Sequence, residues 1–127
     1  RIGMQLPSEI EARYVLPALR ALVAKKLVLE KGFTQEKAAR AVGVTQAAIS
    51  NYIRGVRGFR IYWENNPIVL RHVDKIVELI VSKSDPREIT REFNQMLREL
   101  RKAGVLCRLH KNVEPFIDIN ECNVCFE

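Results

Sequence analysis

Four side chains near the C-terminus have the residue types and the spacing of a metal site. Cys107 and His110 form a C-x-x-H pair, and after eleven intervening residues Cys122 and Cys125 form a C-x-x-C pair. Two short pairs of ligands separated by a loop are the usual layout of a tetrahedral zinc site. We therefore expect these four residues to bind a metal, with zinc as the first choice, and to fold a tail that has little apolar core of its own.

The same side chains also allow thiol chemistry without a metal. Reduced thiols are ordinary in an intracellular protein, and Cys122 and Cys125 could instead form a regulatory disulfide. The sequence near the cysteines shows no acid–base pair with the spacing of a catalytic site and no cofactor-binding loop. The sequence therefore predicts a protein that is not an enzyme.

A second group of polar side chains, in residues 34–55, has the pattern of a surface that contacts the edges of DNA bases. The segment TQEKAARAVGVTQAAISNYIRG predicts two short helices, over residues 35–42 and 46–54. Gly43 lies between them and tolerates the positive φ of a tight turn. Ala39 supplies the small side chain that two crossing helices need where they touch. This arrangement is typical of a helix-turn-helix.

The second of these helices has one apolar face and one polar face. The apolar face holds Val44, Ile49 and either Tyr52 or Ile53. The outward residues are Gln46, Ala47, Ser50, Asn51 and Arg54. Gln and Asn can form two hydrogen bonds with adenine in the major groove, and Ala can contact the methyl group of thymine. The simpler alternative is a helical hairpin whose polar face is only solvated.

Other side chains nearby are expected to contact the phosphate backbone. Arg54, Arg57 and Arg60 have the charge for such contacts, which position a protein on DNA without reading its sequence. Gln35 and Thr45 stand at predicted helix N-termini, where backbone amides and the helix dipole favour phosphate.

The charge is distributed unevenly along the chain. Residues 1–60 hold 11 Lys and Arg against 4 Asp and Glu, whereas residues 61–127 hold 10 against 11. The excess positive charge therefore belongs to the half with the polar helical pattern. Such a half attracts a polyanion and releases counterions when it binds one.

Residues 34–55 resemble the lambda-repressor-like (XRE) helix-turn-helix family. In that class two glutamines have the spacing of Gln35 and Gln46. The second glutamine contacts a base, and the first supports the second glutamine and contacts a phosphate. The resemblance implies these roles here, with double-stranded DNA as the partner and transcription regulation as the function. It covers residues 5–60, where LPSEI-EARYVLPALRALVAKKLV is similar to archaeal regulators of the class.

The resemblance adds an alternative for the cysteines. Many of the archaeal relatives have Cys in an L-P-C-E run, where this chain has Ser8. Four cysteines would imply an iron–sulfur cluster and a redox- or iron-responsive regulator. Ser8 departs from that pattern, which leaves His110 as the candidate fourth ligand.

The elements that position the first half are predicted to be helical. Ser8 and Glu11 have the spacing of a capping box, which predicts a helix that begins just after Ser8. Pro17 lacks an N–H and disfavours helix at Leu16, so a break is expected there, followed by a second helix to Lys31. Thr34 and Thr45 are the expected N-caps of the next two helices.

The second half is predicted to hold a pair of helices and an irregular tail. Apolar residues at helical spacing predict one helix from Pro67 to Lys83, and another from the cap Asp85 to Gly104. The pair can pack against the first domain or form a dimer interface. A loop over residues 58–66 precedes it and carries Phe59, Tyr62 and Trp63, which we expect to attach the loop to the core rather than to stack on DNA.

Together these patterns predict an all-α protein. It would comprise a lambda-repressor-like helix-turn-helix domain over residues 5–60, a dimerising helical pair over residues 67–104, and an irregular Cys-rich tail over residues 105–127. The expected function is that of a homodimeric DNA-binding transcriptional regulator on an inverted repeat. The alternative is a protein-interaction module of the antitoxin or coactivator kind. No apolar run approaches a membrane span, and a cytoplasmic location is expected.

Overall fold

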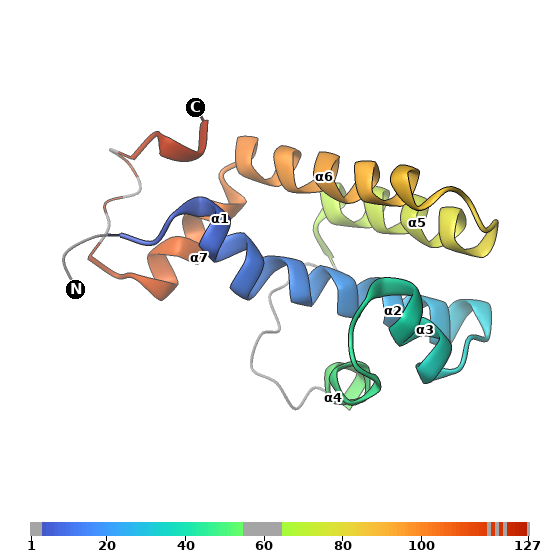
Figure 1. Ribbon diagram of the computed structural model, residues 1–127. Helices are drawn as coiled ribbons and strands as arrows, with labels where there is room; N and C mark the ends of the chain where they lie inside the picture. The colour runs from blue at the N-terminus through green and yellow to red at the C-terminus, as the bar shows by residue number, and fades with distance from the viewer. Residues whose placement is uncertain (1–3, 55–64, 117, 119, 121, 127) are drawn as a thin grey trace.

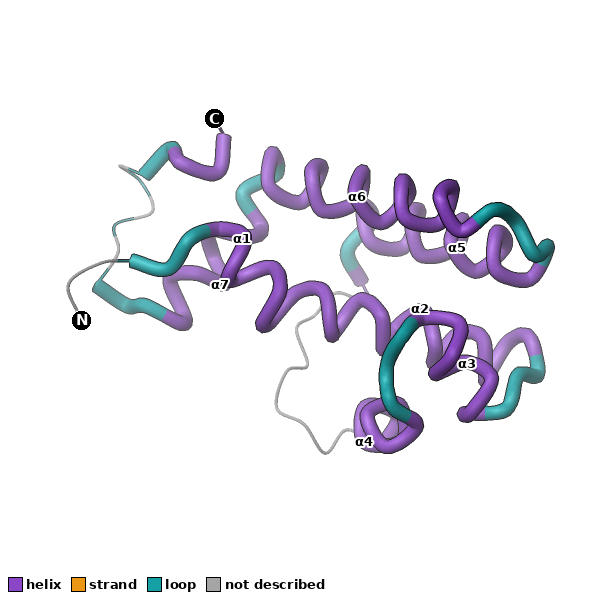
Figure 2. The backbone as a smooth tube through the Cα atoms, viewed as in Figure 1, coloured by secondary structure: helices purple, strands orange, loops and turns teal. Residues whose placement is uncertain are grey.

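The protein is described by a computed structural model that covers residues 4–54, 65–116, 118, 120 and 122–126, without the side chains of residues 52–54 and 126 (Figure 1). All regular structure in these ranges is helical, and no strand occurs among them (Figure 2). The predicted all-α class is therefore confirmed. Phe59, Tyr62 and Trp63 of the predicted loop lie outside the described residues.

The helices, in chain order, are α1 (Pro7–Ile10), the π-helical turn η1 (Glu11–Val15), α2 (Leu16–Lys31), α3 (Gln35–Val42), α4 (Gln46–Arg54), α5 (Pro67–Val81), α6 (Pro86–Lys102), α7 (Val105–Val113) and the 3₁₀ turn η3 (Val124–Phe126). The connections between α2 and α3, α3 and α4, α5 and α6, and α6 and α7 are short. None of the helices in the described ranges has the length and apolar character needed to cross a membrane.

Helix α2 lies at the centre of the molecule. It contacts α3 and α4 on one side and α5 on the other, and α6 packs on α5 (Figure 1). Its buried side chains are Ala18, Leu19, Ala21, Leu22, Val23, Ala24 and Leu27. Several of these are small, so neighbouring helices can pack on more than one face of α2. The helix-turn-helix and the C-terminal pair therefore share one hydrophobic core.

Two ion pairs accompany the packing of α2 on α5. Lys26 Nζ lies 3.0 Å from Asp74 Oδ1, and Lys31 Nζ lies 3.0 Å from Glu78 Oε1. The lysine that comes later in α2 pairs with the acidic residue that comes later in α5, so the two helices run parallel. Exposed pairs of this kind contribute little stability, so burial of apolar side chains is what holds α5 in place.

The predicted capping box at Ser8 is wrong. Helix α1 begins at Pro7, and its cap is Leu6, whose backbone N–H donates to Glu9 Oε1 at 3.0 Å. Glu9 is the third residue of the helix, which is where a side chain can reach back to the cap. Ser8 is exposed within α1.

The predicted break at Leu16 is also wrong. The chain passes from α1 through η1 into α2 without leaving a helical conformation. Pro17 has no N–H, so the α-helical hydrogen bond that would close on the turn before it cannot form. The turn widens instead, and the Leu16 N–H donates to the Glu11 carbonyl, five residues back. A π-helical turn accommodates the missing donor where a break was expected.

The predicted ends of the next helices are confirmed. Helix α2 ends at Lys31 with Gly32 at φ 71°, and α3 ends at Val42 with Gly43 at φ 73°. The Thr34 side chain caps α3 by accepting from the Lys37 N–H at 3.1 Å.

The C-terminal region differs from the prediction in two places. Helix α5 ends at Val81, not Lys83, because Lys83 adopts φ 57°. The tail is not irregular from its start, since Val105 to Val113 form α7. Leu106 is buried there, and Val105, Leu109 and Val113 pack against the core at helical spacing. These apolar contacts stabilise a helix that we did not predict.

An ion network joins α5 to α6, with the buried pair His72 and Glu92 at its centre and exposed side chains around it. The His72 ring is buried, and its Nδ1 contacts the buried Glu92 carboxylate, while its Nε2 lies 3.2 Å from Glu99 Oε2. Lys75 Nζ lies 3.2 Å from Glu92 Oε1, and Arg71 pairs with Glu99. The hydrogen bond from His72 lowers the pKa of the Glu99 carboxyl. Carboxylate oxygens accept, so each ring nitrogen that carries a proton has an acceptor.

Replacement of Glu92 tests this network. We expect Glu92→Gln to lower the free energy of unfolding by about 1–3 kcal/mol, because it removes a buried charge from a partner that stays buried. The measurement is urea unfolding at neutral pH. Glu30→Gln is the matched control, because Glu30 is exposed and its carboxylate makes only a long contact of 3.9 Å with Lys26 Nζ. Equal stability of both variants would show that the network adds nothing.

Candidate nucleic-acid interface

The turn at Gly43 sets the direction of α4. The Gly43 N–H donates to the Ala39 carbonyl, and the Val44 N–H donates to the same carbonyl at 3.1 Å. A Cβ at Gly43 would meet no atom within 4 Å, so the need for glycine comes from its positive φ alone. Ala39 itself is buried, as the predicted helix crossing requires.

Thr45 begins α4 as its cap. Its Oγ1 accepts from the Ala48 N–H at 3.1 Å, and its carbonyl accepts from the Ile49 N–H at 3.3 Å. Ile49 is fully buried and anchors the helix, while Val44 is half-buried against the core. These contacts present the N-terminal end of α4 on the surface, and both residues take the packing role that we predicted for them.

The predicted recognition residues differ in how far they are exposed. Thr45, Gln46 and Ala47 are exposed, and Ser50 and Asn51 are half-buried. The face with the greatest access to a partner is therefore the first turn of α4. The side chain of Arg54, and Arg57 and Arg60 altogether, lie outside the described part of the chain.

The start of α3 lies in the same helix-turn-helix. Gln35 is half-buried at its first position, directly after the cap Thr34. Lys37 is exposed, with Nζ 4.2 Å from the centre of the Phe33 ring. Lys37 therefore adds an exposed basic group two residues after Gln35.

The predicted metal ligands have different neighbours: the cysteines lie near one another, whereas His110 contacts a carboxylate. Cys125 is buried, and burial raises the pKa of its thiol to about 11, with further contributions from the neighbouring Cys107 and Cys122. His110 is buried too, but its Nε2 lies 2.7 Å from Glu114 Oε1. Among the described residues, no three His, Cys, Asp or Glu side chains are placed to hold a metal ion.

Glu114 has a second partner that links the end of α7 to the segment before α1. Its Oε1 accepts from the Gln5 N–H at 2.7 Å, and Gln5, His110 and Glu114 are all buried. We call these three residues the terminal junction. Sequence spacing offered no signal for it, because Gln5 and Glu114 are 109 positions apart.

Comparison with known proteins supports the interpretation of the first half. Residues 25–61 match the model of the helix-turn-helix family, a range that includes residues 25–31 of α2 and all of α3 and α4. Neither the curated proteins nor the solved structures that were compared with the chain gave a match. Residues 25–61 are thus similar to a helix-turn-helix of the XRE type, the all-α fold is consistent with the lambda-repressor-like class, and this supports a DNA-binding regulator in general.

Proposed function

We propose that the protein is a sequence-specific transcriptional regulator that inserts the first turn of α4 into the major groove of double-stranded DNA. The observation that carries this proposal is the arrangement around Thr45. The cap and the buried Ile49 fix the helix, while Gln46 and Ala47 are exposed beside it. A rigid helix end with exposed polar side chains is what base recognition requires. The proposed role is binding, not catalysis.

The proposed contacts follow from the chemistry of each side chain. Gln46 forms two hydrogen bonds with adenine, and Ala47 contacts a thymine methyl group. Ser50 and Asn51 follow one turn later and reach the same groove. The phosphate contacts come from Gln35, Thr45, Arg54, Arg57 and Arg60.

We further propose that a homodimer binds an inverted repeat, with half-sites roughly 34 Å apart. Most of the apolar stripe of α5 is used within the chain, since Val69, Val73, Ile76 and Val77 are buried. What is left is Val81, exposed at the C-terminal end of α5, beside the half-buried Leu79 and Ile80. Within the predicted dimerising region, residues 67–104, this end is therefore the apolar surface that we favour for the dimer contact.

Replacement of Gln46 tests the assignment of the recognition helix. The preferred duplex is first selected from a random pool, and light scattering should find two chains on it. We expect Gln46→Ala to reduce discrimination between this duplex and one with a changed base pair by about 1–3 kcal/mol, because a bidentate contact is lost. The control is Gln95→Ala, which removes an exposed glutamine from α6.

Two results would contradict this assignment. One is an unchanged preferred sequence and affinity for Gln46→Ala. The other is a flat dependence of random-duplex binding on salt, since phosphate contacts release counterions and make that dependence steep. A flat dependence would favour the protein-interaction module instead.

Replacement of Thr45 by Asp separates folding from DNA binding. Asp is as good an N-cap as Thr, and its charge suits the N-terminal end of the helix dipole. We therefore expect Thr45→Asp to leave the melting temperature unchanged or slightly higher. The same carboxylate would repel phosphate, so the affinity for DNA, measured by fluorescence anisotropy, should fall at least about tenfold. Unchanged affinity would place the DNA elsewhere.

Metal binding by the tail is a separate proposal. Its basis is that Cys107 and Cys122 both act on the Cys125 thiol, although the three thiols are not placed around one ion and would have to move to bind it. The contact of His110 with Glu114 does not favour the four-ligand set as predicted. Zinc would hold the tail against α6 and α7. We expect about one zinc per chain in anaerobically purified protein, by elemental analysis, and the same in Ser8→Cys. Iron with sulfide would instead indicate a cluster, and no metal would leave three free thiols.

A further inference from the structure

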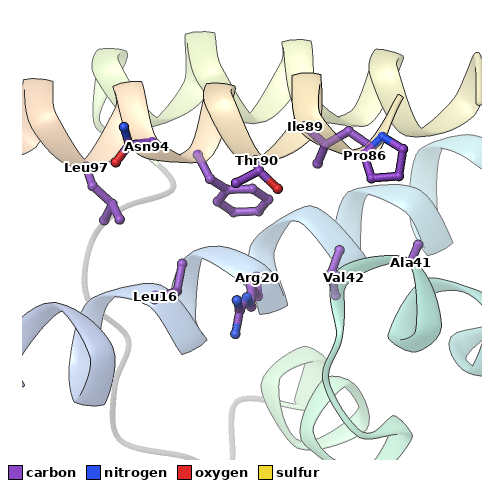
Figure 3. A pocket seen from close by; sticks show the side chains of 10 residues that line it. Leu16, Arg20, Ala41, Val42, Pro86, Ile89, Thr90, Asn94 and Leu97 are labelled. Carbon is purple, nitrogen blue, oxygen red and sulfur yellow. The ribbon is translucent and has the colours of Figure 1, made fainter. Parts of the chain in front are cut away.

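A groove separates α6 from the helix-turn-helix half of the molecule. Its volume is about 430 Å³, within the range of small-molecule sites. One wall is α6, and the other is formed by α2 and the end of α3 (Figure 3). We call it the α2–α6 groove. Its apolar lining includes Leu16, Val42, Ile89, Phe93 and Leu97.

One arginine lines this groove without a partner. Arg20, on α2, is half-buried, and no hydrogen bond or ion pair joins its guanidinium to another residue that the structure describes. In the described ranges the other arginines in this condition are exposed, namely Arg13, Arg91, Arg98 and Arg108. A guanidinium beside apolar walls is partly desolvated, so an anion that entered the groove would bind it more strongly than in open water.

Two polar side chains stand on the opposite wall. Thr90 and Asn94 lie one turn apart on α6, and both line the groove (Figure 3). The Thr90 hydroxyl can donate or accept, and the Asn94 amide can do both. Thr90 and Asn94 are exposed, and with Arg20 they are the polar side chains of a mostly apolar lining.

We infer that the α2–α6 groove binds a small organic carboxylate with an apolar body. The carboxylate pairs with Arg20, and the apolar body lies against Val42, Ile89 and Phe93. No charged side chain other than Arg20 lines the groove, so nothing in its lining repels an anion. The body could be an aliphatic chain or an aromatic ring, because the walls include both kinds of side chain.

The position of the groove gives such a ligand access to the helix-turn-helix. Ala41 and Val42 line it and directly precede Gly43, the turn that sets the direction of α4. A bound carboxylate would therefore join α6 to the end of α3. The inference does not depend on DNA binding, because the site and its test lie within the free protein.

The test is calorimetric titration of the full chain at low salt with octanoate, 3-phenylpropionate and octanol. We expect saturable binding of a carboxylate at one per chain, with the stronger of the two carboxylates identifying the body. Octanol, the neutral analogue of octanoate, should bind at least about tenfold more weakly. Arg20→Gln should weaken carboxylate binding by a similar factor. Arg98→Gln removes an exposed arginine from α6 and should change the dissociation constant less than about twofold.

Three outcomes would overturn the inference. They are the absence of saturable binding, equal binding of octanol and octanoate, and carboxylate binding that survives in a folded Arg20→Gln variant. Circular dichroism checks that the variant folds. If it does not, the comparison of octanoate with octanol on the unchanged protein still decides whether a charge in the groove selects the ligand.

Discussion

Burial of α2 is the constraint on which the rest of the structure depends. Its small and apolar side chains face α3 and α4 on one side and α5 on the other, so a single helix fixes the positions of both halves. The π-helical turn before Pro17 keeps α1 and α2 in one continuous helical segment, so Pro17 does not break the chain away from α2. The surface that we assign to DNA and the helices that line the groove therefore share one support.

The parts of the fold that could be predicted are those in which the information is local. Glycines at positive φ ended α2 and α3 where expected, and the threonines before α3 and α4 capped them. Ile49 was predicted to be buried, and Gln46 to be exposed, because a helix repeats every 3.6 residues. The burial and exposure of side chains in the first turn of α4 could thus be predicted from the segment 34–55 alone.

The parts that could not be predicted depend on contacts between distant residues. Helix α7 is stabilised because Leu106 is buried in the core, and the sequence of the tail alone does not show which core residues it packs against. The sequence around His72 shows no cluster of ligand residues, yet in the fold its ring is paired with two carboxylates of α6. His110 had the spacing of a ligand, but a carboxylate one turn away in the same segment occupies its Nε2. Spacing predicts which residues can meet, whereas packing decides which of them do.

The terminal junction has a consequence for the order in which the chain folds. Its hydrogen bond closes a loop of 109 residues, and the entropy lost in closing so long a loop is recovered only once the intervening helices are already compact. Local turns such as that at Gly43 carry no such cost. Folding should therefore proceed outward from α2 and its neighbours, with the segment before α1 and the end of α7 joining last. This junction should be the first to separate when the native state opens.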